Sequence, residues 1–300
     1  MTASHWNVLS IYLGFTLIAT LLALARRWLR PGTDGESLWR KYPTYILINL
    51  GFLAASWSPP TWHILTALLS LLGGLAAWEI ARALFQAQKT SISFSAILLP
   101  CMTFALIVLA GWLEMTVWFK VWLILVLLLT AMNTITGAPG DYGQRILALS
   151  GCVFYLPICL AAYLWIHQSD PTGFRAAFLY LTIATNDALA QITGQLFGAR
   201  PLAPHISPAK TVEGAIGGVL FAGAMGYALS STVGWSYSFG AISGILLGMA
   251  GLIGDLTASV WKRALGLKNF GELLGAQGGI LDRFDGLIFA APVFYLLIVV

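Results

Sequence analysis

The chain has 300 residues, of which 58% are hydrophobic and only 9% are charged, whereas about 25% of residues are charged in soluble proteins. A soluble fold of this size could not bury so much apolar surface, so the composition excludes a soluble globular protein and indicates a chain that lipid solvates. The net charge of +4 is too small to predict a nucleic-acid partner.

Ten apolar stretches are predicted to span a membrane as helices. They repeatedly reach the roughly 20 residues that a helix needs to cross a hydrocarbon core of about 30 Å. The alternating pattern of a membrane barrel is absent, so we predict an all-α fold, a polytopic transmembrane helical bundle of about ten helices. The predicted spans are 7–26, 43–58, 61–81, 92–112, 116–136, 146–167, 174–197, 212–233, 237–258 and 284–300.

The first two spans differ from the others in their flanks or length. No positive segment precedes Val8–Leu24 and no small-residue cleavage site follows it, so we expect a retained helix and not a removed signal peptide. The second span is short, and Ser58-Pro59-Pro60 after it is a turn signal that neither neighbouring helix could absorb.

Basic residues gather at one side of the predicted bundle. With the N-terminus outside, fourteen of the sixteen Lys and Arg residues fall in or beside inner loops, and only Lys120 and Arg175 fall at the other side. Because Lys and Arg are enriched in cytoplasmic loops, we predict that both termini face outside. The longest polar loops, about 27–42, 198–211 and 259–283, then face the cytoplasm.

A first group of polar residues runs from the seventh predicted helix into the eighth. Asp187 lies about midway along an apolar helix, where an ionised carboxylate costs about 3 kcal/mol, so it predicts a polar cavity; pairing with another helix is the alternative. Ser207, Lys210 and Thr211 stand at a predicted helix start, where N–H groups, hydroxyls and an ammonium can bind phosphate. An ordinary helix start, with Ser207 or Thr211 as its cap, is the alternative there.

A second group lies between the ninth and tenth helices and consists of Asp255, Asp282, Asp285, Lys262, Arg263 and Lys268. Its last two acids are three residues apart and project from one helix face. Mg²⁺ binds through one or two carboxylates together with substrate phosphates, and a basic, glycine-rich loop suits an anion. The group therefore indicates Mg²⁺-nucleotide chemistry at the membrane face. A positive-inside loop with helix-capping acids is the alternative.

Residues 185–286 hold these groups as an ordered series of motifs. The series consists of Asp187, Gly194 to Arg200, Ser207-Pro208-x-Lys210-Thr211-x-Glu213-Gly214, Ser259-x-x-Lys262-Arg263, Lys268 and Gly278-Gly279-x-x-Asp282-Arg283-x-Asp285. In order and spacing it resembles the phosphatidate cytidylyltransferases, or CDP-diacylglycerol synthases. The first half of the chain is similar to that family only in being a run of membrane helices.

The resemblance implies a reaction in which CTP and phosphatidate, or a close lipid phosphate, give CDP-diacylglycerol and pyrophosphate. It implies Mg²⁺ as cofactor, with a second cation left open, and a homodimer embedded in membrane lipid. The implied catalytic residues are Asp255, Asp282 and Asp285 as metal ligands, with Lys262, Arg263 and Lys268 on the triphosphate. The implied substrate-binding residues are Asp187, Ser207, Lys210, Thr211, Gln277, Gly278, Gly279 and Arg283. We accordingly divide the chain into N-terminal transmembrane helices, 1–173, and a transmembrane catalytic region with a site at its cytoplasmic face, 174–300.

The last motif departs from the family pattern. Asn269 stands in place of the usual aspartate, and Gln277, preceded by Ala276, stands in place of a histidine preceded by glycine; the usual proline shortly before is also missing. Asn269 keeps an oxygen but loses a negative charge. Gln277 can hydrogen-bond but cannot carry a proton near neutral pH.

Two alternatives of other classes remain open from the sequence. The departures motivate a degenerate relative that binds lipid or nucleotide without turnover. Asp187 inside a helix motivates a small-molecule transporter, although the sequence lacks the repeated helix sets that are common in transporters. Glu79, an acid inside the third predicted span, is compatible with helix pairing and with a functional role.

Overall fold

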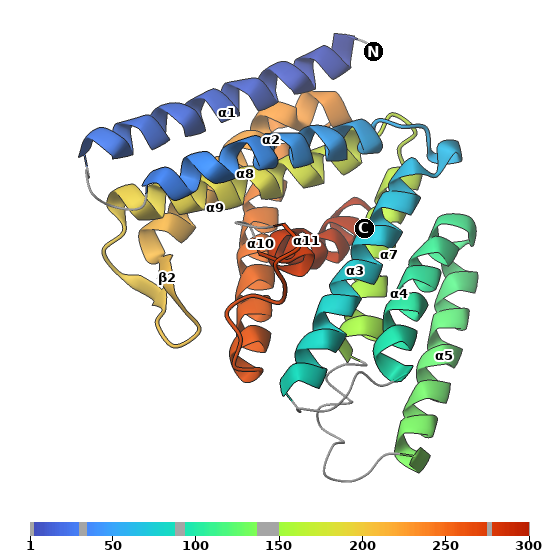
Figure 1. Ribbon diagram of the computed structural model, residues 1–300. Coiled ribbons are helices and arrows are strands. Elements are labelled where there is room, and N and C mark those ends of the chain that lie inside the picture. The colour runs from blue at the N-terminus through green and yellow to red at the C-terminus, as the bar shows by residue number, and fades with distance from the viewer. Residues whose placement is uncertain (1–2, 30–34, 88–93, 137–149, 275–277, 300) are drawn as a thin grey trace. The chain divides into compact units, whose positions relative to one another are not determined.

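The computed structural model describes residues 3–29, 35–87, 94–136, 150–274 and 278–299. This part of the chain is almost entirely helical, with one small hairpin (Figure 1). The elements of the first half are α1 (Ala3–Leu29), α2 (Gly35–Ser56), η1 (Pro60–Trp62), α3 (Ile64–Ala87), α4 (Phe94–Trp112), α5 (Met115–Thr136), η3 (Ser150–Tyr155) and α7 (Leu156–Gln168). Those of the second half are α8 (Phe174–Phe197), β1 (Pro201–Ala203), β2 (Ser207–Thr211), α9 (Val212–Leu229), η4 (Ser230–Val233), α10 (Tyr237–Ala264) and α11 (Ile280–Val299).

Each of the ten predicted spans corresponds to a helix in the described part of the chain, which confirms the all-α, polytopic transmembrane bundle. Five stretches within it are long and apolar enough to cross a membrane by themselves: Ala3–Ala25, Ile64–Leu84, Gly151–Gln168, Val212–Val233 and Tyr237–Ala264. α8 and α11 are not among these five, and they carry acids of the two motif groups. That both termini face the side opposite the cytoplasm stays a prediction.

Several helices extend beyond their predicted spans on the polar side, among them α2, α3 (to Ala87) and α10. α2 begins at Gly35 and not near residue 43, because a helix can continue through charged residues outside lipid where an apolar pattern has already ended. α10 continues to Ala264, so Lys262 and Arg263 lie in its last turn and not in the loop where we expected them. Cations in the last turn of a helix interact favourably with the helix dipole.

The helices form two compact units. The first unit consists of Met1–Trp57, Thr172–Val260 and Asp285–Val300, and the second consists of Ser58–Pro171 and Trp261–Phe284. The predicted division at residue 173 separates segments with polar motifs from segments without them, and it stays a prediction. Each of the two packed units contains motif residues together with helices from the first half of the chain.

In the first unit, α8, α9 and α10 approach one another at glycines. A Cβ added at Gly244 of α10 would clash with the backbone carbonyl of Ala222 in α9, and one added at Gly218 of α9 would lie 2.8 Å from the carbonyl oxygen of Asn186 in α8. Small residues at such crossings let membrane helices pack backbone against backbone. The glycines therefore set the spacing of the helices that carry Asp187 and Asp255.

Gly244→Ala is expected to destabilise the first unit by about 1–3 kcal/mol, because the new methyl group must push two backbones apart. Thermal unfolding in detergent should show a lower midpoint for this variant than for the unchanged protein. Gly51→Ala is the matched control, since nothing lies within 4 Å of a Cβ built at Gly51. Equal midpoints for the two variants would contradict close packing at Gly244.

A buried polar network joins the first two helices to α8 in the same unit. The hydroxyl of Tyr180 donates to Oδ1 of Asn49 at 2.6 Å, and Nδ2 of Asn49 donates to the hydroxyl of Tyr12 at 3.1 Å. The hydroxyl of Tyr45 donates to the carbonyl of Ala184 at 2.7 Å. These bonds satisfy polar groups where water is absent, and they tie α1 and α2 to the helix that carries Asp187.

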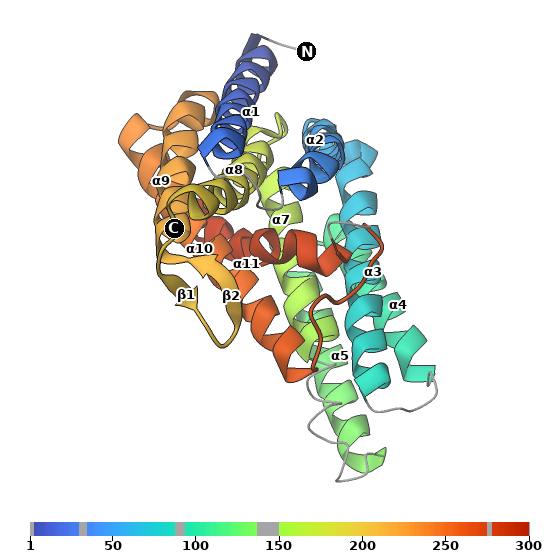
Figure 2. The same ribbon diagram turned by 60° about the vertical axis from the view of Figure 1, so that its left-hand side comes forward.

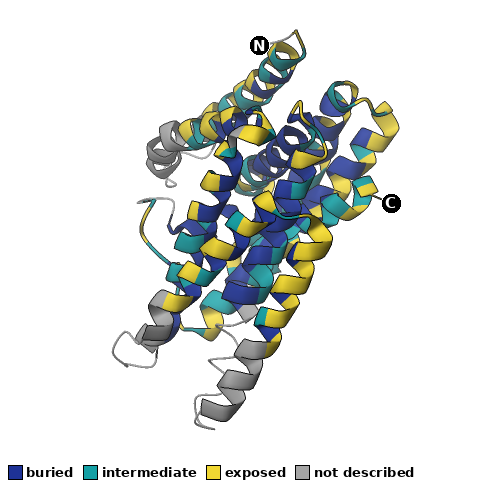
Figure 3. Cartoon of the chain, turned by 90° about the vertical axis from the view of Figure 1, so that its right-hand side faces the viewer, coloured by how far each residue is buried: buried dark blue, intermediate teal, exposed yellow. Residues whose placement is uncertain are grey.

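In the second unit, side-chain donors of α4 and α5 bond to backbone carbonyls of neighbouring helices. Trp122 Nε1 donates to Val153 O at 2.9 Å, and Thr103 Oγ1 donates to Cys152 O at 2.6 Å. Exposed apolar side chains line α5 (yellow in Figure 3), among them Phe119 and Leu127. This surface suits contact with lipid tails.

Candidate active site

A β-hairpin precedes α9 in the first unit. β1 (Pro201–Ala203) pairs antiparallel with β2 (Ser207–Thr211), as Figure 2 shows. Only Thr211 stands at the helix start, where its Oγ1 accepts a hydrogen bond from Gly214 N at 3.1 Å. The expectation that Ser207 and Lys210 also begin the helix was wrong, because both lie in an extended strand that pairs with β1. Thr211 thus has the capping role that the sequence left open.

Glu213 in the first turn of α9 anchors the segment that leads into the hairpin. Its Oε2 accepts from Ala199 N at 3.0 Å and from Arg200 N at 3.2 Å, and its Oε1 accepts from Arg200 Nε at 3.0 Å. Gly198 fits here because a Cβ would meet the Gly194 carbonyl and the Thr211 side chain. The hairpin is therefore fixed at both ends by the first turn of α9.

Lys210 and Asp255 form an ion pair inside the first unit. The Lys210 ammonium contacts Oδ2 of Asp255, and the two side chains are partly exposed, at 21% and 34%. The sequence placed these residues in separate groups, one for phosphate and one for metal. The fold brings the hairpin cation into contact with the first acid of the second group, so the two motif groups meet at this ion pair.

Asp187 and Asp285 lie in the helices on which the sequence placed them. Asp187 is midway along α8, where Asn186 Nδ2 donates to its Oδ1 at 3.2 Å. Asp285 is buried in α11, and its Oδ1 accepts from Gly286 N at 2.8 Å. A Cβ at Gly254 would lie 2.7 Å from Asp285 O, so Gly254 lets α10 approach α11 just before Asp255. The substrate and metal roles of these acids stay predictions.

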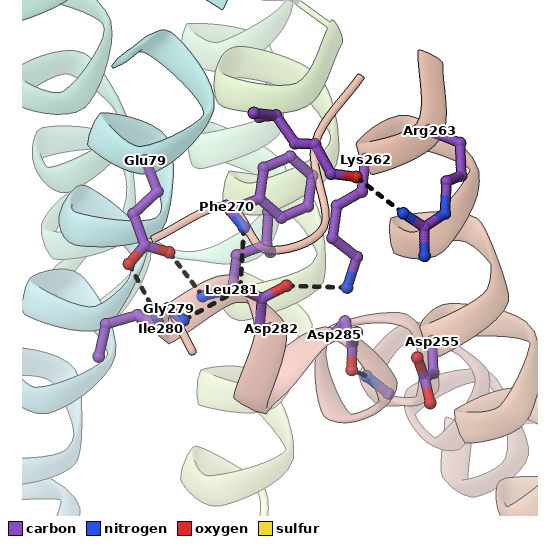
Figure 4. Close-up of polar contacts among 12 residues, drawn as sticks. Glu79, Asp255, Lys262, Arg263, Phe270, Gly279, Ile280, Leu281, Asp282 and Asp285 are labelled. Carbon is purple, nitrogen blue, oxygen red and sulfur yellow. Dashed lines mark hydrogen bonds and ion pairs between the residues drawn. The ribbon is translucent and has the colours of Figure 1, made fainter. Parts of the chain in front are cut away.

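In the second unit, Asp282 in the first turn of α11 accepts hydrogen bonds from the end of α10 and from the loop between the two helices (Figure 4). Its Oδ1 accepts from Lys262 Nζ at 2.8 Å, and its Oδ2 accepts from Phe270 N at 2.9 Å and Gly279 N at 3.0 Å. Only 7% of the Asp282 side chain and 12% of the Lys262 side chain are exposed. Charge-assisted bonds of this kind are about twice as strong as neutral ones. Lys262 and Asp282, predicted as partners in one site, are thus in direct contact.

The remaining predicted residues lie in the last turn of α10, the loop that follows it and the start of α11. Arg263 and Lys268 are exposed, and Arg263 Nη1 donates to Leu267 O at 3.1 Å. Arg283 is half-buried in α11. Gln277 lies outside the described residues. Gly278 has φ +84°, a conformation that favours glycine, and this accounts for the first glycine of the pair without reference to substrate.

Glu79 of α3, left undecided by the sequence, contacts the first turn of α11. Its Oε1 accepts from Ile280 N at 2.9 Å and its Oε2 accepts from Leu281 N at 3.0 Å (Figure 4). A Cβ at Gly279 would lie 2.5 Å from Oε2 of Glu79, which accounts for the second glycine of the pair. The signal in the sequence was an ionisable residue inside an apolar helix, which by default indicates a functional position.

The donor chemistry of the three aspartates fits Mg²⁺, which prefers carboxylate oxygens. Among the described residues, no three or more His, Cys, Asp or Glu side chains are grouped as they would be around a metal ion. Asp255 and Asp285 belong to the first unit and Asp282 to the second. A metal ion shared by all three therefore stays a prediction.

Comparison with known proteins covers the region of both motif groups. Residues 39–300 match the model of the cytidylyltransferase family. The phosphatidate cytidylyltransferase of Aquifex aeolicus is 41% identical over 145 residues, which are 48% of this chain and 54% of that protein. The phosphatidate cytidylyltransferase of Synechocystis is 40% identical to this chain over 140 residues, which are 45% of this chain and 47% of that protein. That of Brucella abortus is 38% identical over 149 residues, which are 48% of this chain and 54% of that protein.

The chain spans about half the length of these curated relatives. The family match is wider, because it takes in α3, the hairpin, α10 and α11, and with them every residue of the polar contacts around Asp255, Asp282 and Glu79. It agrees with the resemblance that the order of the motifs indicated, and it covers most of the sequence. The chain therefore belongs to the cytidylyltransferase family.

Proposed function

We propose that this protein transfers a cytidylyl group from CTP to phosphatidate or a close lipid phosphate, giving CDP-diacylglycerol and pyrophosphate. The observation that carries the proposal is the family match over residues 39–300, since it includes every charged residue of both motif groups. The printed names of the similar proteins, phosphatidate cytidylyltransferases, support the same substrates. The membrane-embedded fold supports a lipid acceptor whose acyl chains stay in the bilayer.

In the proposed reaction, a phosphate oxygen of the lipid attacks the α-phosphorus of CTP. The new P–O bond forms while the bond between the α-phosphorus and its bridging oxygen breaks, and pyrophosphate leaves with the electron pair. No protein nucleophile is needed, so catalysis consists of positioning and of charge neutralisation. Lys262, Arg263 and Lys268 would hold the triphosphate, and Lys210 would hold a substrate phosphate with Ser207 and Thr211 beside it.

Asp255, Asp282 and Asp285 are the proposed ligands of Mg²⁺, and a second cation stays open. When bound, Mg²⁺ would neutralise phosphate charge and polarise the phosphorus that is attacked. Two of these carboxylates also contact lysines of the chain. The Asp282 carboxylate orients Lys262, and the Asp255 carboxylate holds Lys210, so each of the two lysines is held in place by an acid of the second motif group.

The protein is an integral membrane protein with several apolar helices. We further propose that it resides in a bacterial inner membrane with its site facing the cytoplasm, where CTP is made, and that it forms a homodimer. The orientation is supported by the fourteen of sixteen basic residues on one side of the predicted topology.

The proposal is tested by assaying the purified protein in detergent with labelled CTP, a panel of lipid phosphates, and Mg²⁺ or a chelator. We expect labelled CDP-lipid with phosphatidate and Mg²⁺, and none with diacylglycerol, which lacks the attacking phosphate. ATP in place of CTP is the control for nucleotide specificity.

Two outcomes would contradict the proposal. CTP binding without product for any lipid phosphate would indicate a binding relative, and recovery of activity in Asn269→Asp with Gln277→His would identify those two positions as the cause. Substrate flux into proteoliposomes without CTP consumption would indicate a transporter.

A further inference from the structure

We propose that Glu79, on a helix outside both motif groups, is a positioning residue that holds the first turn of α11 and so orients Asp282. The proposal rests on the proposed function for its effect on catalysis. The contact itself stands on the geometry of the second unit, in which all the residues concerned lie. It assigns a role in the site to the first half of the chain, which has no recognisable motif.

The contact satisfies a particular need of α11. Ile280 and Leu281 are its first residues, and the first four N–H groups of a helix have no acceptor within the helix. Both N–H groups donate to the Glu79 carboxylate, one to each oxygen, across 201 and 202 positions of sequence. A carboxylate at a helix N-terminus is also favoured by the helix dipole. Glu79 thus caps α11 from another helix.

The same stretch of backbone also holds Asp282. Three consecutive N–H groups are shared between two carboxylates: that of Gly279 donates to Asp282, and those of Ile280 and Leu281 donate to Glu79. If the first turn of α11 shifts, the Gly279 N–H shifts with it and Asp282 loses the alignment that holds Lys262. Glu79 therefore acts on the site through the backbone and without touching substrate.

The loop is built around this carboxylate. A Cβ at either Gly271 or Gly279 would lie 2.5 Å from an oxygen of Glu79, so both glycines leave space that the carboxylate fills. Glu79 is 5% exposed. Burying an acid in an apolar helix is costly, and a pure packing role would not need one, whereas two N–H groups aimed at one side chain need two acceptor oxygens.

The decisive variant is Glu79→Gln, which keeps the size of the side chain and replaces one acceptor oxygen by an amide donor. We expect kcat for CDP-lipid formation to fall about 10- to 100-fold, as when a group that orients a functional ligand is removed. KM for CTP should change by less than about twofold, because Glu79 does not bind substrate. Glu114→Gln is the matched control, since Glu114 is an exposed acid of the same unit.

Hydrogen exchange in detergent gives a readout that is independent of activity. In Glu79→Gln, the amides of residues 278–284 should exchange about tenfold faster or more, while those of α4 and α7 should not change. Gly271→Ala should have the same local effect, because its methyl group displaces the carboxylate without altering Glu79. Gly271→Ala therefore also tests the contact if the Glu79→Gln protein does not accumulate in the membrane.

The outcomes separate this proposal from the proposed function. Unchanged exchange at residues 278–284 in both variants would overturn the capping contact, whatever the activity. Faster exchange with unchanged kcat would overturn the positioning role. If the unchanged protein converts no lipid phosphate, the proposed function fails, and the exchange measurement still decides whether Glu79 holds the first turn of α11.

Discussion

Asp282→Asn is expected to lower kcat/KM for CDP-lipid formation by about a thousandfold, the size of effect seen when a preorganised electrostatic contact is lost. The carboxylate accepts three hydrogen bonds, from Lys262, Phe270 N and Gly279 N. An asparagine has only one acceptor oxygen, so its amide group must face either the ammonium or the two N–H groups. It also leaves the poorly exposed Lys262 without a negative partner, which is costly.

This prediction is measured by steady-state assays on purified protein at saturating Mg²⁺. Glu272→Gln is the matched control, because Glu272 is an exposed acid of the same loop. We expect its kcat/KM to stay within about twofold of the unchanged protein. An active Asp282→Asn variant would remove Asp282 from the catalytic residues and leave it only a role in the loop.

Lys210→Gln is expected to lower kcat/KM about a hundredfold, because the variant loses the cation that would hold a substrate phosphate. Asp255→Asn should have an effect of similar or larger size. Since the two side chains form an ion pair, the double variant should be less impaired than the product of the single effects, as is usual for residues in contact. If the two effects simply multiply, the two side chains act independently of each other and the ion pair is not used in the reaction.

The same assays check the Lys210 prediction, with Lys120→Gln as the matched control. Lys120 is an exposed lysine of α5 and was predicted to lie on the opposite side of the membrane from the site. An equal loss of activity in both lysine variants would indicate a general effect on folding or insertion.

Much of the fold follows from the sequence, because each membrane helix forms its backbone hydrogen bonds within its own segment. Length and apolarity alone therefore located ten helices, and their ends differ from prediction mainly where a helix continues into polar residues, as in α2 and α10. The order and spacing of the charged motifs also sufficed to indicate the family that the comparison with known proteins confirmed.

The contacts that build the site were decided only by the tertiary structure. The hairpin was missed because its strands are three and five residues long and bury no apolar face that would produce a pattern. The pairs Lys210–Asp255 and Glu79–Ile280 join residues far apart in sequence. The apolar pattern of a helix shows which of its faces meets lipid, whereas such pairs depend on which segments meet and how closely. Glycines decide this: Gly254 meets the backbone of α11 just before Asp255, and Gly279 leaves the space that the Glu79 carboxylate fills.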